Sequence, residues 1–396
     1  MPVNLIDIQK KLTSFSMQAK AHHQRVVSRL ETLRERLQTY SDRLDQLKEI
    51  VNREAEVNPR LRCAVPVDEP LDAVIPVGSL PEVVSLAAAD GSQINPSHHA
   101  RVPFCVINVG VVTMSRGSGE TPEIHTQSNL LDYDTVLPPE GGMLSEGGVA
   151  LKRDLAERTV LLNVTGEIPA PVITMVDGPL ELIRDPQTAG GFDTFVRDYE
   201  SILSGFREKD LVLLGYIDKS QNDLIGRLLA LTPSEGVELG DSSKQAESDL
   251  SGVRDIYLME TLLRNPGDRS AMFAVYSRTA LSFKPEHRLH FFYLNVGTSD
   301  HPHLARVEIP AWVAEDKQKI SLIQAALLDQ AQMMGSRPYP YLLHRAHEEA
   351  LVSLDEHQWV EDMIVIEFLD DGMAVGELSH KQYLKDMDMK KKRYQQ

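Results

Sequence analysis

Two acidic residues each follow an apolar, strand-like run and precede a glycine. Asp90 closes the run VVSLAAAD, and Asp177 closes VITMVD. Asp-Gly is also a strong signal for a tight hairpin, which is the competing interpretation. In a hairpin the next apolar run follows the glycine at once, as it does after Asp371 and Gly372, whereas more than ten residues separate Gly91 from the next apolar run. We therefore interpret Asp90 as a carboxylate at the end of a strand.

Two strands that end in Asp-Gly would present their carboxylates at one edge of an α/β sheet, where ligands bind in this class of fold. The glycine after each aspartate lets a bulky ligand approach the backbone. Two carboxylates in contact repel each other unless a cation lies between them. Because Mg²⁺ and Mn²⁺ prefer oxygen ligands, Asp90 and Asp177 predict a site for a divalent cation.

A third carboxylate would complete such a site. The helix-like segment 147–163 offers Asp154 and Glu157, for which a solvated helix face is the alternative interpretation. Lys219 follows another strand-like run, DLVLLGYID, and is a candidate for contacting a phosphate, with plain surface exposure as the alternative.

Strand-like and helix-like runs alternate from residue 83 onward, which predicts an α/β domain with a mixed, partly parallel sheet flanked by helices. We place this domain at 83–365, with 116–148 mostly loop, a loop insertion at 232–250, and a C-terminal hairpin and basic tail at 366–396. One final helix is predicted from Tyr339 to about residue 365. The strand-like runs are 83–90, 104–114, 170–178, 210–218, 289–297 and 305–313, and 319–335 is predicted to be an amphipathic helix closed by Gly335.

The N-terminal segment 1–58 is predicted to be a long helix, because residues 4–56 contain neither Gly nor Pro. Two interpretations of its heptad pattern stand side by side. One is a coiled-coil-like helix that protrudes or pairs, which we slightly favour, and the other is a helix packed on its own domain. Residues 59–82 are predicted to be a linker. The heptad positions are Val26, Leu30, Leu33, Leu37, Tyr40, Leu44, Leu47 and Val51.

The composition is that of an ordinary globular protein, with 42% hydrophobic and 25% charged residues. Two isolated cysteines, Cys63 and Cys105, predict neither a disulfide framework nor a thiolate zinc site. The sequence shows no signal peptide or membrane span, so we expect a cytoplasmic protein that does not bind a membrane. The net charge of −17 argues against nucleic-acid binding, but a carboxylate site becomes locally positive once it binds metal.

Several motifs, in order along residues 83–360, resemble the NurA nuclease family. They are AAADGSQI, a helical LAER, VITMVDGPLE, LGYIDKSQNDLIGRLL, ARVEIPAWV and RPYPYLLHRAHEEALV. The last motif, with its Tyr-Pro and Ala-His pairs, is the most specific. The resemblance implies a ribonuclease-H-like core that processes DNA ends.

By this resemblance Asp90, Glu157 and Asp177 are the acidic metal ligands, and Tyr339 and His347 are the aromatic and histidine components of the site. If the final helix already includes Tyr339, the eight-residue spacing places Tyr339 and His347 about 80° apart, facing one groove. The alternatives for the third carboxylate are Asp154, Glu146 and Asp134.

The predicted function is metal-dependent hydrolysis of DNA phosphodiester bonds, with two Mn²⁺ or Mg²⁺ ions about 3.5–4 Å apart. The resemblance further implies 5′→3′ exonuclease and single-strand endonuclease activity, a homodimer, and a HerA-type hexameric ATPase as partner in DNA end resection and recombinational repair. The chain has no Walker lysine loop of its own. Two rival functions remain: a metal-dependent phosphoesterase acting on RNA or nucleotides, and a non-catalytic adaptor that retains the fold.

Overall fold

The computed structural model describes residues 4–139, 141–182, 192–233, 250, 252–373 and 375. The chain divides into two compact units. Unit 1 comprises Met1–Leu80 and Gly215–Pro340, and unit 2 comprises Pro81–Leu214 and Tyr341–Gln396. The loop predicted at 232–250 and the basic tail lie almost entirely outside the described residues.

Unit 2 is built on a mixed sheet with the strand order β5-β4-β3-β6. β3 (Val84–Ile94) pairs antiparallel with β4 (Val106–Arg116), which pairs antiparallel with β5 (Glu123–Leu130). β6 (Val172–Asp177) pairs parallel with β3. On the far side of β6, the Thr174 hydroxyl donates a hydrogen bond to the Val212 carbonyl at 3.2 Å, where β7 (Val212–Asp218) begins. The predicted mixed, partly parallel sheet is confirmed.

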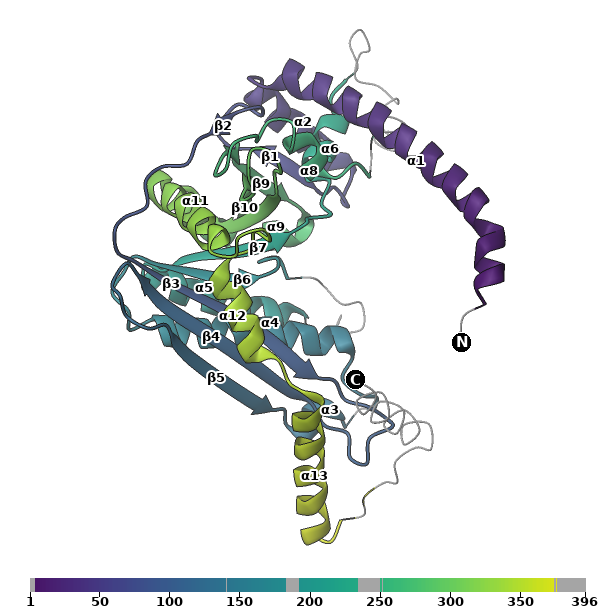
Figure 1. The fold of residues 1–396 in the computed structure, drawn as a ribbon, viewed down its shortest axis with the longest axis vertical. Coiled ribbons are helices and arrows are strands. Elements are labelled where there is room, and N and C mark those ends of the chain that lie inside the picture. Colours follow the sequence, from purple (N-terminus) through teal and green to yellow (C-terminus); the bar gives the residue numbers. More distant parts are fainter. Residues whose placement is uncertain are drawn as a thin grey trace. The chain divides into compact units, whose positions relative to one another are not determined.

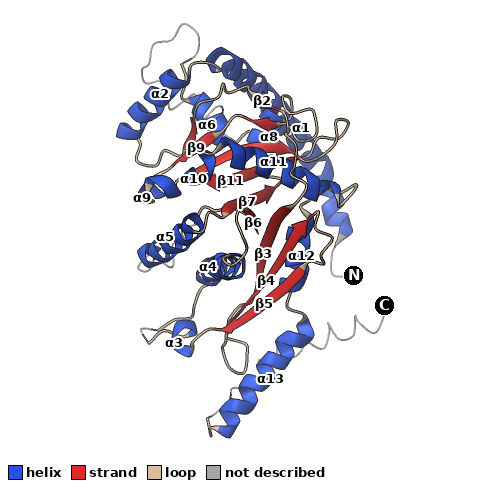
Figure 2. Ribbon diagram, turned by 90° about the vertical axis from the view of Figure 1, so that its left-hand side faces the viewer, coloured by secondary structure: helices blue, strands red, loops and turns tan. Residues whose placement is uncertain are grey.

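Helices cover both faces of this sheet. α4 (Glu146–Thr165) packs on one face of β3 and β4, and α12 (Tyr341–Ala350) packs on the other (Figure 2). The Ser145 hydroxyl caps α4 by accepting from the Gly148 amide at 3.0 Å. α5 (Phe192–Glu208) packs beside α4, and α3 (Tyr133–Val136) and α13 (Leu354–Asp370) complete the unit.

Three predicted features of unit 2 are wrong. The segment 116–148 is not mostly loop, because β5 pairs along β4 over eight residue pairs although it carries no apolar run. The single final helix is two helices, since Ser353 and Glu356 form a capping box that starts α13. The predicted hairpin at Asp371-Gly372 has no first strand, because α13 continues to Asp370 and Gly372, with φ 71°, follows its end.

Unit 1 contains an antiparallel run of strands in the order β1-β9-β10-β11-β7, and the short pair β2–β8 beside β10. The predicted linker 59–82 therefore contributes two paired strands, β1 and β2. The strands are β1 (Cys63–Pro66), β2 (Val74–Ile75), β8 (Arg269–Ser270), β9 (Phe273–Tyr276), β10 (Leu289–Asn295) and β11 (Leu304–Pro310). The helices after β7 are α6 (Leu224–Ala230), α8 (Asp255–Met259), α9 (Arg278–Ser282), η2 (Pro285–His287), α10 (Ala311–Ala314) and α11 (Lys317–Gln332).

The N-terminal segment forms two helices, α1 (Leu5–Tyr40) and α2 (Leu44–Val57), and α1 is the long helix at the start of the chain (Figure 1). The second half of the heptad pattern packs within unit 1, where Leu33, Leu37 and Leu47 are buried and Arg36 donates to the Leu229 carbonyl at 2.9 Å. The first half of α1 is exposed. The interpretation of a helix packed on its own domain is therefore confirmed for the second half of the segment, and the coiled-coil interpretation stays a prediction for the exposed first half.

Both cysteines, Cys63 and Cys105, are buried and free, as predicted. Within the described part of the chain, no helix is both long enough and apolar enough to cross a membrane.

Candidate active site

Asp90 and Asp177 occupy neighbouring positions on adjacent strands. The parallel register of β3 and β6 runs to the pair Ala89–Val176, so the next residue of each strand is Asp90 and Asp177. In-register neighbours of a parallel pair direct their side chains to the same face of the sheet. β6 ends at Asp177, as predicted, whereas β3 continues to Ile94 because its pairing with β4 extends past Asp90. The predicted strand end at Asp90 is therefore wrong, but the two residues still occupy neighbouring positions on adjacent strands.

His347 approaches Asp90 from α12. Its Nδ1 lies 2.6 Å from Asp90 Oδ2, and the histidine side chain is 53% exposed while that of Asp90 is 14% exposed. The C-terminal end of α12 is fixed by the Ala350 carbonyl, which accepts hydrogen bonds from the Ser92 hydroxyl and from the Asn108 side-chain amide at 2.8 Å. The imidazole therefore bonds to the carboxylate on one side and remains open to solvent on the other.

Gly110 allows α12 to lie this close to the sheet. It is the cross-strand partner of Asp90, and a Cβ at this position would lie 2.8 Å from both the Ala346 carbonyl oxygen and the Ala350 amide nitrogen. Those contacts are with backbone atoms, which cannot move aside as a side chain can. The glycine within the apolar run VINVGVV is a sequence signal for such a close approach, and it was not used in the sequence analysis.

We expect Gly110→Ala to push α12 away from β4 and to separate His347 from Asp90. Overpacking at a tight contact typically destabilises a protein by about 1–3 kcal/mol. The free energy of unfolding, measured by urea denaturation, should fall by that amount. Gly226→Ala is the control, since a Cβ there would meet its nearest atom, the Val253 carbonyl oxygen, at an ordinary 3.5 Å and Gly226 has no positive φ. Equal losses in the two variants would contradict the proposed packing role of Gly110.

Glu157 lies on the opposite face of β3. Its Oε1 would be 2.6 Å from a Cβ at Gly91, the residue after Asp90, and consecutive strand residues point to opposite faces. The carboxylate is 3% exposed, with Arg153 Nε at 3.2 Å and Arg158 Nη1 at 3.9 Å. Burial raises the pKa of Glu157 to about 8, although Arg158 and Arg153 act in the opposite direction. The negative charges of Asp154 and Asp90 raise this pKa further.

The alternatives for the third carboxylate lie in different surroundings. Asp154 accepts a hydrogen bond from Arg153 at 3.2 Å, whereas Glu146 and Asp134 are exposed in the first turns of α4 and α3. Of the four candidates, only Glu157 is buried. The Glu157 carboxylate reaches toward Gly91, the residue after Asp90, and Glu157 stays the predicted third carboxylate.

The side chains at this edge of the sheet are of types that bind a divalent cation. Asp90, Asp177 and His347 bring two carboxylates and one imidazole to one face of the sheet, and these are groups that Mg²⁺ and Mn²⁺ accept. In the part of the chain that the structure describes, no three His, Cys, Asp or Glu side chains are already grouped as a metal site. Glu157 is held on the other face by its arginines, so it would have to leave Arg153 to join a cation bound at Asp90.

Tyr339 and Lys219 belong to unit 1, whereas the other four candidate residues belong to unit 2. α12 begins at Tyr341, so the predicted helix containing Tyr339 is wrong, and the calculated angle between Tyr339 and His347 does not apply. Instead Tyr339 packs edge-to-face on Tyr216, with ring centroids 5.5 Å apart. Lys219 is exposed and has a positive φ of 48° directly after β7.

Comparison with known proteins identifies the family. The model of the NurA domain matches residues 84–352. No curated protein sequence matches the chain. Among solved structures, the NurA nuclease from Sulfolobus solfataricus is similar, with a TM-score of 0.53 and 13% identity over 93% of this chain and 98% of that one. At 13% sequence identity, this similarity shows that the two proteins share a fold.

Two further solved structures are less similar to this chain, and no conclusion about its function is drawn from them. The catalytic domain of human Endonuclease V has a TM-score of 0.31 and 14% identity over 71% of this chain and 84% of that one. The RNase H domain of prototype foamy virus has a TM-score of 0.21 and 12% identity over 42% of this chain and 92% of that one. The family match spans most of the sequence, including β3, α4, β6 and α12, which carry Asp90, Glu157, Asp177 and His347. The chain therefore belongs to the NurA family.

Proposed function

We propose that this chain is a metal-dependent nuclease that hydrolyses phosphodiester bonds of DNA. The observation that carries the proposal is the placement of Asp90 and Asp177 at neighbouring positions of β3 and β6, with His347 bonded to Asp90. Membership of the NurA family supports it, since the Sulfolobus solfataricus protein is named as a nuclease.

In this proposal Asp90 and Asp177 hold one or two Mn²⁺ or Mg²⁺ ions, with His347 beside them and Glu157 joining when it leaves Arg153. Bound there, the ions lower the pKa of the attacking water and stabilise charge on the attacking and leaving oxygens. His347 orients the Asp90 carboxylate through its Nδ1, and its exposed ring edge is free to contact a phosphate oxygen or a water molecule. Arg153 neutralises Glu157 while the site is empty of substrate.

The mode of cleavage, the cellular process and the partner are proposed from the family resemblance. We propose 5′→3′ exonuclease and single-strand endonuclease activity in DNA end resection and recombinational repair, in the cytoplasm, with a HerA-type hexameric ATPase as partner. A chain without a Walker lysine loop needs such a partner to move processively along duplex DNA. Tyr339 and Lys219 are proposed to contact the substrate, the first with its ring and the second with its ammonium group.

A digestion panel tests the proposal. End-labelled single-stranded DNA, duplex DNA, RNA and free nucleotides are incubated with the full chain and Mn²⁺, and in parallel with EDTA. We expect cleavage of DNA that EDTA abolishes. Cleavage of RNA or nucleotides alone would favour the phosphoesterase alternative, and no cleavage of any substrate with Mn²⁺ would favour the adaptor.

We further propose that the chain forms a homodimer through the exposed half of α1. Its apolar residues Leu5, Leu12 and Phe15 are 60%, 53% and 69% exposed, and together with Ile8 they follow a heptad spacing. Such a seam is typical of a helix that pairs with another helix.

Deleting residues 1–25 removes this seam and leaves the half of the segment that packs within unit 1. We expect the mass in solution, measured by light scattering, to fall from that of a dimer to that of a monomer, because the exposed seam is lost. The matched control is Lys10→Ala with Lys20→Ala, which changes exposed positions of the same helix outside the seam. An unchanged dimer after the deletion would place the interface elsewhere.

A further inference from the structure

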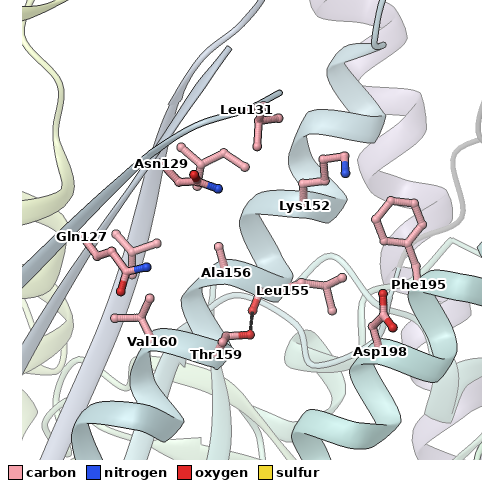
Figure 3. A pocket seen from close by; sticks show the side chains of 12 residues that line it. Gln127, Asn129, Leu131, Lys152, Leu155, Ala156, Thr159, Val160, Phe195 and Asp198 are labelled. Carbon is pink, nitrogen blue, oxygen red and sulfur yellow. Dashed lines mark hydrogen bonds between the residues drawn. The ribbon is translucent and has the colours of Figure 1, made fainter. Parts of the chain in front are cut away.

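Unit 2 contains a pocket on the face of the sheet that carries α4. It has a volume of about 330 Å³ and lies between β4, β5, α4 and α5 (Figure 3). This volume is within the usual range of small-molecule sites, which is about 300–1,000 Å³. The pocket is separate from the candidate active site, because Asp90 and Gly110 face α12 whereas the pocket residues of β4 face the opposite way.

The floor of the pocket combines apolar and amide side chains. Ile107 and Val109 of β4 are buried, and their cross-strand partners on β5 are Asn129 and Gln127. Alternate residues of a strand share a face, so both amides lie on the pocket side beside the apolar floor (Figure 3). Ser128, between them, faces the other way and donates to Asn108 Oδ1 at 2.7 Å.

The opposite wall carries a cation over an aromatic ring. Lys152 Nζ of α4 lies 5.7 Å from the ring centroid of Phe195 on α5. No ion pair of Lys152 occurs among the described residues, which is consistent with an ammonium group that is held near the ring and left open to an anion. Asp198, one turn after Phe195, adds a carboxylate at the rim, and Leu155 adds apolar surface (Figure 3).

These groups match the parts of a nucleotide. An apolar wall with an aromatic ring accepts the face of a base, and stacking of this kind contributes to single-strand binding. A side-chain amide presents a donor and an acceptor that pair with the edge of a base, most directly with adenine. An unpaired ammonium group attracts a phosphate, and a carboxylate accepts a hydrogen bond from a sugar hydroxyl or an exocyclic amine.

We propose that this pocket binds one nucleotide, either an unpaired nucleotide of a bound strand or a free nucleoside monophosphate, at a distance from the cleavage site. The inference rests on the proposed function, because a nuclease on DNA encounters both forms. A nucleotide held here anchors the strand on the α4 face while the phosphodiester bond is cut on the α12 face.

The test measures binding without cleavage. The full chain carrying Asp90→Ala is titrated in EDTA with a labelled single-stranded 12-mer, and separately with dAMP by calorimetry. Gln127→Leu removes the amide with little change in size, and Lys152→Met removes the ammonium group. The matched control is Ser128→Ala, on the other face of the same strand. Thermal midpoints of all variants confirm that they are folded.

We expect Gln127→Leu and Lys152→Met each to weaken strand binding by about five- to a hundred-and-fiftyfold, with Ser128→Ala unchanged, since a single contact to a nucleotide contributes about 1–3 kcal/mol. In the chain with Asp90 intact, the same two variants should raise KM and leave kcat unaltered. Displacement of the strand by dAMP would identify the free monophosphate as a ligand, and strand binding that dAMP does not displace would identify the unpaired nucleotide.

Equal affinities in the pocket variants and in Ser128→Ala would overturn this inference. That failure is distinct from failure of the proposed function. If Asp90→Ala abolishes cleavage while the pocket variants bind normally, the nuclease assignment holds and the pocket assignment does not. If the pocket variants lose binding but the intact chain cuts no substrate, the pocket assignment holds and the nuclease assignment does not.

Discussion

Asp90→Ala should lower the rate of Mn²⁺-dependent DNA cleavage on the order of a thousandfold, because a bound cation contributes several kcal/mol to stabilising the transition state. The carboxylate lies beside Asp177 and bonds to His347, so its removal takes away one of the two oxygen donors on this face. The fold should survive, since β3 keeps its pairing with β4 and with β6. The rate is measured on end-labelled single-stranded DNA, and the thermal midpoint is followed in parallel.

The matched control for this prediction is Glu348→Gln. Glu348 is the neighbour of His347 on α12, and its carboxylate pairs with Arg345 and His344 rather than with the sheet. We expect its activity to stay within about twofold of the wild type, as is usual for an exposed ion pair. Asp177→Ala should reproduce the loss seen with Asp90→Ala. Wild-type activity in both aspartate variants would exclude a shared cation at this edge as the source of cleavage.

Glu157→Gln should make the metal-free protein more stable than the wild type at alkaline pH. The pKa of Glu157 is raised from an ordinary 4.5 to about 8 in the folded protein, first of all by burial. A carboxyl group with a raised pKa binds its proton more tightly in the folded state. Its contribution to the free energy of unfolding is therefore complete below about pH 4.5 and is lost as the pH rises through about 8. Glutamine does not titrate, so the Glu157→Gln variant does not lose stability in this way as the pH rises.

The free energies of unfolding of wild type and Glu157→Gln should therefore converge near pH 4.5 and diverge by a few kcal/mol above pH 8, given 1.36 kcal/mol for each unit of pKa difference. The measurement is urea denaturation in EDTA at pH 5 and pH 8.5. Glu146→Gln, an exposed position in the first turn of α4, is the control and should show no such divergence. Parallel pH profiles for Glu157→Gln and wild type would show that Glu157 is ionised at no cost in the folded protein.

Adding Mn²⁺ to the same pair of proteins tests whether Glu157 is a ligand. A ligand that binds only the folded state raises its stability. At pH 8.5 Mn²⁺ should raise the thermal midpoint of the wild type more than that of Glu157→Gln, because a carboxylate binds the cation more strongly than a neutral amide does. Equal increases would leave Asp90 and Asp177 as the cation ligands and exclude Glu157.

The sequence alone predicted the elements that carry the site. The apolar runs that end at Asp177 and Asp218, and the helical pattern around Glu157, correspond to β6, β7 and α4, because strand and helix periodicity are local properties of the chain. The resemblance to the NurA family was likewise readable from short motifs along the chain, and the family match confirms it. What the sequence left open was which side chains share a face.

Only the tertiary structure decided those relationships. β5 carries no apolar run and is a strand because β4 lies beside it, and β3 extends past Asp90 for the same reason. Glu157 and Asp90 lie on opposite faces of one strand, and Tyr339 belongs to a different compact unit from His347. Strand register and helix packing join residues far apart in the chain, and local periodicity contains no information on these pairings. The close approach of α12 at Gly110, on which the position of His347 depends, is of this kind.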